Sequence, residues 1–214
     1  MQKDIDERDE MDFFDINLQP MPESVPKGST YEYYLGLLDR QIWLDTDVDL
    51  DEGTLSIVKQ IIRWNREDKR IPVKERKPII LYCFSFGGDL DLCNSIIDAI
   101  RLSKTPVYTV NVGRCMSAGA YIFIAGHKRF IFPHSYFLFH QGSNTVGGTA
   151  SEMKAQMENY NKQVEDLSEL MRTYTKYDDE KIKSNITSEW FVRAKEALEN
   201  GVCDKMITSL DEIL

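Results

Sequence analysis

A serine set among small residues, with a histidine further along the chain, is the combination best suited here to nucleophilic chemistry. Ser117 lies in Gly-Arg-Cys-Met-Ser-Ala-Gly-Ala, between apolar runs at 107–112 and 120–125 that predict a buried strand and a buried helix. At such a turn, N–H groups and the helix dipole favour negative charge developing near the hydroxyl. His140 follows the apolar run 135–139, so we expect it at a strand end. The pattern predicts a serine nucleophile with a histidine base.

A pair of glycines adds a second part of such a site. Residues 78–84 predict a strand, Ser85-Phe86-Gly87-Gly88 follows, and residues 89–101 predict a helix. Two glycines after a strand leave the backbone free to aim N–H groups at an oxyanion. Structural readings stay open, because a serine at a helix start is often an N-cap and a glycine pair is often only a turn. Cys115 is an alternative nucleophile in the same region.

The order of these motifs resembles the ClpP family of serine peptidases. The resemblance rests on Ser-x-Gly-Gly after one strand, Gly-x-x-x-Ser-x-Gly-Ala after the next, and an apolar strand ending in His-Gln. Residues 191–204 add Phe-x-x-Ala-x-Glu-Ala-x-x-x-Gly-x-x-Asp, as at the family's C-terminal end. The similarity runs from about residue 31 to residue 208.

The resemblance implies a role for each matching residue. Ser117 would be the nucleophile, His140 the general base, and the N–H groups of Gly88 and Ala118 the oxyanion hole. The family's third member, an aspartate, falls on Glu189. Glutamate keeps the carboxylate that orients the imidazole and stabilises its cation, but the extra methylene moves the carboxylate by about one carbon–carbon bond.

Other features depart from the family or leave alternatives open. Asp178 and Asp179 are alternative acids, although they also fit the start of a short helix. Phe86 stands where the family usually carries proline beside the glycines. The connection 65–77 is longer than usual, and its mixed charges predict a solvated surface loop.

Composition limits the classes of partner. A net charge of −9 and a pI near 4.9 argue against nucleic acid and anionic membranes. No run approaches the roughly 20 apolar residues of a membrane span, and the first residues lack a signal-peptide core, so we expect a cytoplasmic protein. No metal-ligand spacing or nucleotide-binding loop is present, so we expect no cofactor. The cysteines lack Cys-x-x-Cys pairing and predict reduced core residues: Cys83, Cys93, Cys115 and Cys203.

The chain is expected to comprise an acidic, partly mobile segment at 1–28 and a ClpP-like peptidase domain at 29–214. Alternating strands and helices predict an α/β fold, and the resemblance implies a ClpP/crotonase-like spiral of ββα units with a projecting handle helix. Further patterns predict a short helix at 31–38, a strand at 41–44 and an amphipathic helix at 53–64. The inward residues expected in that last helix are Leu55, Val58, Ile61 and Ile62.

The handle helix is expected at about 149–176. Its apolar residues form a narrow seam with heptad spacing, which favours one partner surface over the wider stripe of a globular helix. The alternative is a helix lying on its own domain. In the resembled family this helix is where two heptameric rings meet. The seam residues are Met153, Met157, Tyr160, Val164, Leu167, Met171 and Tyr174.

We therefore expect a serine endopeptidase that cleaves peptides or unfolded proteins inside an oligomeric chamber. The resemblance implies heptameric rings stacked as a 14-mer and an AAA+ unfoldase partner, which alone would use ATP. Alternatives are a phage head-maturation or scaffold protease, a non-hydrolytic structural subunit of a ClpP-type ring, and an acyl-coenzyme A enzyme of the related crotonase superfamily.

Overall fold

The computed structural model describes residues 35–49 and 52–213. The chain divides into two units, Met1–Asp39 and Arg40–Leu214. In the first unit, residues 35–38 are helical, while the rest of the helix expected at 31–38 and the whole segment 1–28 lie outside the described residues. The proposed domain boundary near residue 28 therefore stays a prediction.

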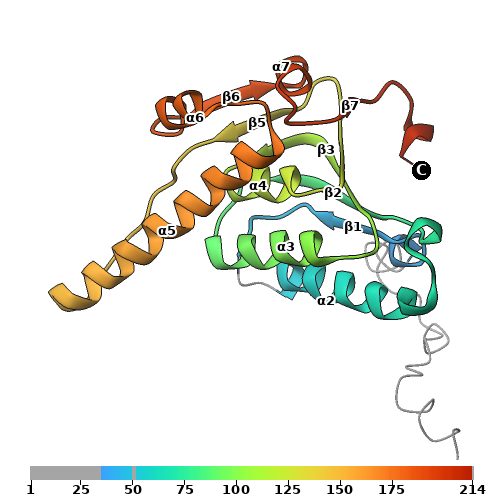
Figure 1. Cartoon of the computed structure of the whole chain (residues 1–214), viewed down its shortest axis with the longest axis horizontal. Helices are drawn as coiled ribbons and strands as arrows, with labels where there is room; N and C mark the ends of the chain where they lie inside the picture. Colours follow the sequence, from blue (N-terminus) through green and yellow to red (C-terminus); the bar gives the residue numbers. More distant parts are fainter. Residues whose placement is uncertain (1–34, 50–51, 214) are drawn as a thin grey trace, which may run out of the picture. The chain divides into compact units, whose positions relative to one another are not determined.

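The described strands of the second unit form one sheet in the order β1-β2-β3-β4-β7, with β5 paired to β3 and β6 paired to β5 (Figure 1). All pairs are parallel except β5–β6. Strands of a parallel sheet are buried on both faces and read as continuous apolar runs, as the sequence IILYCFS of β2 does. Their bounds are β1 Gln41–Leu44, β2 Ile79–Ser85, β3 Val107–Met116, β4 Lys128–Ile131, β5 Tyr136–Phe139, β6 Trp190–Arg193 and β7 Lys205–Met206.

Helices α2 and α3 lie side by side along one face of the sheet (Figure 1). Helix α4 packs against α3 and against β3. This alternation of strand and helix confirms the α/β prediction. The helices are α2 Glu52–Glu67, α3 Leu90–Leu102, α4 Ala118–Ile124, α5 Ala150–Tyr174, α6 Asp179–Asn185 and α7 Ala194–Glu199, with short 3-10 turns at Asp68–Arg70, Val73–Glu75 and Leu210–Glu212.

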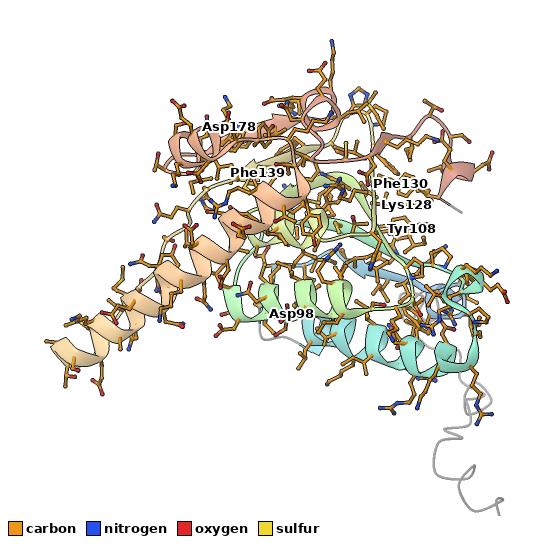
Figure 2. All side chains as sticks on the ribbon, viewed as in Figure 1. Asp98, Tyr108, Lys128, Phe130, Phe139 and Asp178 are labelled. Carbon is orange, nitrogen blue, oxygen red and sulfur yellow. The ribbon has the colours of Figure 1, made fainter. Side chains whose placement is uncertain are left out.

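The hydrophobic core centres on α4, because every residue of this helix is buried. Phe123 of α4 packs against Phe137 of β5 with ring centroids 4.8 Å apart. A second cluster includes Ile80, Tyr82 and Val110 with Ile207 and Ile213 near the C-terminus. At the edge of that cluster the labelled side chains of Tyr108, Lys128 and Phe130 lie together (Figure 2).

The seam of α5 has two different surroundings. The helix begins with a capping box between Thr149 and Glu152. Near its C-terminus, Leu167 and Met171 are buried against the same unit. Near its N-terminus, Met153 and Met157 are 36% and 39% exposed, and this part of α5 extends away from α3 and α4 (Figure 1). The C-terminal half of the helix is therefore buried on its own unit, while the apolar side chains at its N-terminal end are exposed.

The inward face predicted for α2 is wrong for Leu55 and Ile62. These two residues are 40% and 52% exposed. Two apolar stripes run side by side on this helix, and packing buries the one that contains the bulky Trp64, because residues three and four apart share a face. The buried residues of that stripe are Thr54, Ile57, Ile61 and Trp64.

The connection 65–77 is largely exposed, as its charges predict, but it is anchored at one buried residue. Asp68 is fully buried and accepts hydrogen bonds from Arg40 at 2.6 and 2.7 Å and from the Thr105 hydroxyl at 2.7 Å. The Arg40 hydrogen bond holds the pKa of the Asp68 carboxyl below its usual range. Asn65 adds bonds to the backbone N–H groups of Lys104 and Thr105. One buried carboxylate thus anchors the connection to the start of β3.

Candidate functional site

Ser117 occupies a sharp turn between β3, which ends at Met116, and α4, which begins at Ala118. Its backbone angles are φ 50° and ψ −127°, a region that residues with a Cβ rarely adopt. The Ser117 N–H donates to the Leu138 carbonyl at 2.7 Å, which fixes the turn against β5. A strained strand-to-helix turn exposes a serine hydroxyl at the top of a sheet, as in the nucleophile elbow of unrelated hydrolases.

His140 reaches Ser117 because β5 runs parallel to the end of β3. Met116 is paired with Leu138, so the residues that follow the two strands come together. The distance from His140 Nε2 to Ser117 Oγ is 2.8 Å. This is hydrogen-bond distance, and with the Nε2 lone pair free the imidazole can accept the hydroxyl proton. The two residues singled out in the sequence are thus in direct contact.

The glycine turn after β2 lies directly against Ser117. Gly87 and Gly88 have φ values of 97° and 146°, and a Cβ on Gly87 would lie only 2.6 Å from the Ser117 Cβ. On the other side, Val48 donates to the Gly87 carbonyl and accepts from the Asp89 N–H. Among residues 35–49 and 52–213, the N–H groups of Gly88 and Ala118 have no acceptor. Two free donors therefore flank the serine.

Glu189 lies opposite His140 in the β5–β6 register, but no hydrogen bond or ion pair joins the two side chains. Phe139 pairs with Trp190, so His140 and Glu189 are the next residues of the two strands. The Glu189 side chain is exposed, and in the described part of the chain it makes no hydrogen bond or ion pair. The role of Glu189 as the triad acid stays a prediction.

The two alternative acids, Asp178 and Asp179, form interactions at α6 and its junction with α5. Asp178 caps α6, where it is labelled in Figure 2, and its carboxylate accepts from the Lys181 N–H at 2.7 Å. Asp179 pairs with Arg172 at 2.7 Å and with Lys183 at 2.6 Å. Both carboxylates stabilise α6 and its junction with α5.

The alternative nucleophile Cys115 is fully buried. Burial raises the pKa of its thiol well above the ordinary value, so the thiol stays protonated and unreactive. All four cysteines are buried and free, as predicted. In the described residues no cluster of His, Cys, Asp and Glu could hold a metal ion. No helix in that part of the chain is long and apolar enough to cross a membrane.

A cleft of about 720 Å³ opens over the Ser117–His140 pair. One wall is the turn that carries Phe86 and Gly88, and the opposite wall is the segment that follows His140. Residues 141–148 have no regular secondary structure, and α5 lies beside them. The cleft is open to solvent.

Sequence reasoning missed two contacts from α5 to this cleft. The Tyr160 hydroxyl donates to the Gln141 carbonyl at 2.7 Å, and the Gln163 amide donates to Asp91 at 2.6 Å. Tyr160 was expected only in the helix seam. The one feature of the sequence that indicated a hydrogen bond in addition to packing was the Tyr160 hydroxyl, because an apolar seam needs no hydroxyl.

Comparison with known proteins gives consistent matches over most of the chain. The family model described as Clp protease matches residues 27–210. ATP-dependent Clp protease proteolytic subunit 2 of Bifidobacterium longum (strain NCC 2705) is 33% identical over 195 residues, which cover 89% of this chain and 90% of that protein. The proteins of the same name from Treponema denticola and Corynebacterium diphtheriae are each 33% identical, over 81% and 85% of this chain and 84% and 87% of their own lengths.

Proposed function

The chain belongs to the Clp protease family of serine peptidases, and we propose that it is an endopeptidase that uses Ser117 and His140. The observation that carries this proposal is the 2.8 Å contact between Ser117 Oγ and His140 Nε2 beside two free backbone donors. The acyl-coenzyme A alternative loses its support, because the matched family is proteolytic.

Acylation follows from this geometry. Ser117 Oγ attacks the carbonyl carbon of the scissile peptide while its proton moves to His140 Nε2. The negative oxygen of the tetrahedral intermediate accepts hydrogen bonds from the N–H groups of Gly88 and Ala118. When the carbon–nitrogen bond breaks, His140 gives the proton to the leaving amine. Water then hydrolyses the ester by the same route in reverse.

Glu189 is the carboxylate we propose for orienting His140. It flanks the imidazole in the β5–β6 register, and its exposed side chain is free to turn toward Nδ1. A carboxylate there selects the tautomer that leaves Nε2 as acceptor and stabilises the imidazolium.

The substrate is proposed to bind as an added strand along residues 142–148. Within the described residues, the backbone groups of 142–146 have no partners, so they are free to pair with an extended peptide. Backbone pairing is independent of sequence and suits peptides and unfolded proteins. Gly88 on the opposite wall places the proposed oxyanion donors within reach of the same peptide.

An oligomeric chamber is proposed from the seam of α5. Met153 and Met157 are exposed apolar side chains on a helix segment that extends from its unit, a surface that favours a second copy. We propose heptameric rings stacked as a 14-mer in the cytoplasm, served by an AAA+ unfoldase that alone uses ATP. The subunit itself needs no cofactor for acyl transfer, and its charge of −9 disfavours nucleic acid and anionic membranes.

A second candidate is a non-hydrolytic subunit of a ClpP-type ring. One observation favours it: within residues 35–49 and 52–213, no carboxylate forms a hydrogen bond or ion pair with His140. The intact contact between Ser117 and His140 favours the hydrolytic subunit instead.

Hydrolysis of a quenched peptide and of unfolded casein by the full-length protein separates these candidates. The proposal predicts cleavage by the wild type and a loss of about 10⁴-fold or more in Ser117→Ala and in His140→Ala, with the double variant no worse than either, because the two residues act as a unit. Rings that cleave neither substrate would identify the non-hydrolytic subunit. Unchanged hydrolysis in Ser117→Ala would contradict the assignment of the nucleophile.

A further inference from the structure

An arginine lies between two phenylalanine rings next to the cleft. The Arg114 guanidinium carbon is 3.5 Å from the ring centroid of Phe86 and 4.5 Å from that of Phe84. Both distances fall within the range of cation–π attraction. The three side chains form one stack across the ends of β2 and β3.

The strand register explains why these side chains meet. Ser85 of β2 pairs with Cys115 of β3; both are buried, and Ser85 lies against Gly119 of α4. Because successive side chains of a strand alternate between faces, the neighbours of this pair point to the other face. Gly113 leaves room for the stack, since a Cβ there would lie 2.8 Å from the Phe84 ring.

The Arg114 guanidinium is unusually short of partners. Its Nε is buried and has no hydrogen-bond acceptor in the described part of the chain. No carboxylate among those residues pairs with it either. A buried N–H without an acceptor is unfavourable, and such groups in a folded protein call for an explanation. The guanidinium instead lies against the faces of Phe84 and Phe86.

Phe86 connects the stack to the proposed active site. Its side chain is 52% exposed and lines the same cleft as Ser117 and His140. It directly precedes Gly87, which packs against Ser117. Arg114 does not line the cleft. The Phe86 ring is the side chain that joins Arg114 to the cleft.

We propose that Phe86 is a specificity-determining residue for peptide hydrolysis and that Arg114 is the positioning residue that holds its ring. The subsite takes a flat aromatic side chain of the peptide next to the scissile bond. Because Arg114 already holds one face of the Phe86 ring, this ring loses little conformational entropy when an aromatic side chain of the peptide stacks on its other face. More of the stacking energy then contributes to the affinity for the peptide. This inference rests on the proposed peptidase function.

The test uses full-length protein and quenched peptides that differ in a single residue, phenylalanine or alanine, moved one position at a time along the peptide. At one position next to the cleaved bond, the wild type should favour phenylalanine by about 3–10-fold in kcat/KM, mainly through KM. Phe86→Ala should bring this ratio close to one. Arg114→Gln should lower it part of the way, and Arg114→Lys, which keeps a cation, should recover some of it.

Phe191→Ala is the matched control, because Phe191 is a phenylalanine 47% exposed on β6 that does not line the cleft. The ratio in this variant should equal that of the wild type. Phe86→Leu guards against misfolding, since it keeps an apolar side chain and should retain an intermediate ratio. A ratio that is unchanged in Phe86→Ala would overturn the inference while leaving the peptidase function intact. A wild type that cleaves no peptide of the panel would overturn both.

Discussion

Two atoms, Ser117 Oγ and His140 Nε2, lie 2.8 Å apart because two strands end beside each other. The types and order of these residues could be predicted from the sequence, since each follows an apolar run that predicts a strand. The strained backbone at Ser117 could not, because it depends on the bond from its N–H to Leu138, a residue of another strand. The same holds for Tyr160, whose bond to Gln141 joins a helix to a segment before it.

Glu189→Gln tests the proposed orienting carboxylate. The amide cannot stabilise an imidazolium, so turnover should fall by about 10²–10⁴ with little change in KM. Glu189→Asp should retain much of the activity, because it keeps the charge. Steady-state peptide hydrolysis measures both effects.

Asp178→Asn is the matched control for this substitution. Asp178 caps α6, and asparagine is a comparable cap, so both stability and turnover should change little. If turnover falls in Asp178→Asn and stays intact in Glu189→Gln, the carboxylate has been assigned to the wrong residue.

Helix α5 shows how far periodicity reaches at the scale of an element. The heptad pattern predicted a helix at about 149–176, and α5 spans Ala150–Tyr174. In the structure Leu167 and Met171 are buried by their own unit, while Met153 and Met157 remain exposed. Periodicity could not predict this difference, because the spacing of apolar residues does not show which surface packs on them.

Replacing both Met153 and Met157 with aspartate should break the assembly and leave the subunit folded. These side chains are exposed within the subunit, so the free energy of unfolding of the subunit should change by less than about 1 kcal/mol. In a ring-to-ring contact the new charges would be buried without partners. Light scattering should show the mass falling to single rings or smaller, with peptide hydrolysis falling alongside it.

Lys154→Asp is matched to that double variant, because it changes the net charge by the same amount on the same helix. Its side chain is 79% exposed, and its mass should equal that of the wild type. A double methionine variant that assembles fully would show that this face has no partner.

The connection between α2 and β2 depends on the Asp68 carboxylate. Asp68→Asn would leave Arg40 without its counter-charge and should cost about 3 kcal/mol in the free energy of unfolding near neutral pH. The pKa of Asp68 is lowered in the fold, so the stabilisation is present above the ordinary carboxyl value and lost as pH falls through the lowered value. In urea unfolding, the gap between wild type and variant should narrow below about pH 4.

Glu67→Gln provides the comparison, because Glu67 forms an exposed pair with Arg63 four residues away. This change should cost less than about 1 kcal/mol. If the two variants lost the same free energy of unfolding, the buried Asp68 pair would stabilise the fold no more than an exposed ion pair does. The charged run of this connection predicted solvent exposure, and only the position of Arg40 and Thr105 in the fold reveals the anchor.

At the scale of the whole molecule, the sequence predicted the α/β fold and the family, because the motifs around Ser117, His140 and residues 191–204 keep their order and spacing. Its inward face for α2 is right for Ile61 but wrong for Leu55 and Ile62, because two apolar stripes compete on this helix and tertiary packing decides between them. The proposed chamber adds what one chain lacks, a partner for Met153 and Met157.

Reaction with a small fluorophosphonate tests the central claim most directly, because the reagent needs only an activated serine and an oxyanion hole and no particular peptide. Intact-mass measurement followed by peptide mapping should find one adduct per chain, on Ser117, in the wild type and none in Ser117→Ala. An unmodified wild type, or an adduct that persists in Ser117→Ala, would contradict the assignment of Ser117 as the nucleophile of a serine peptidase.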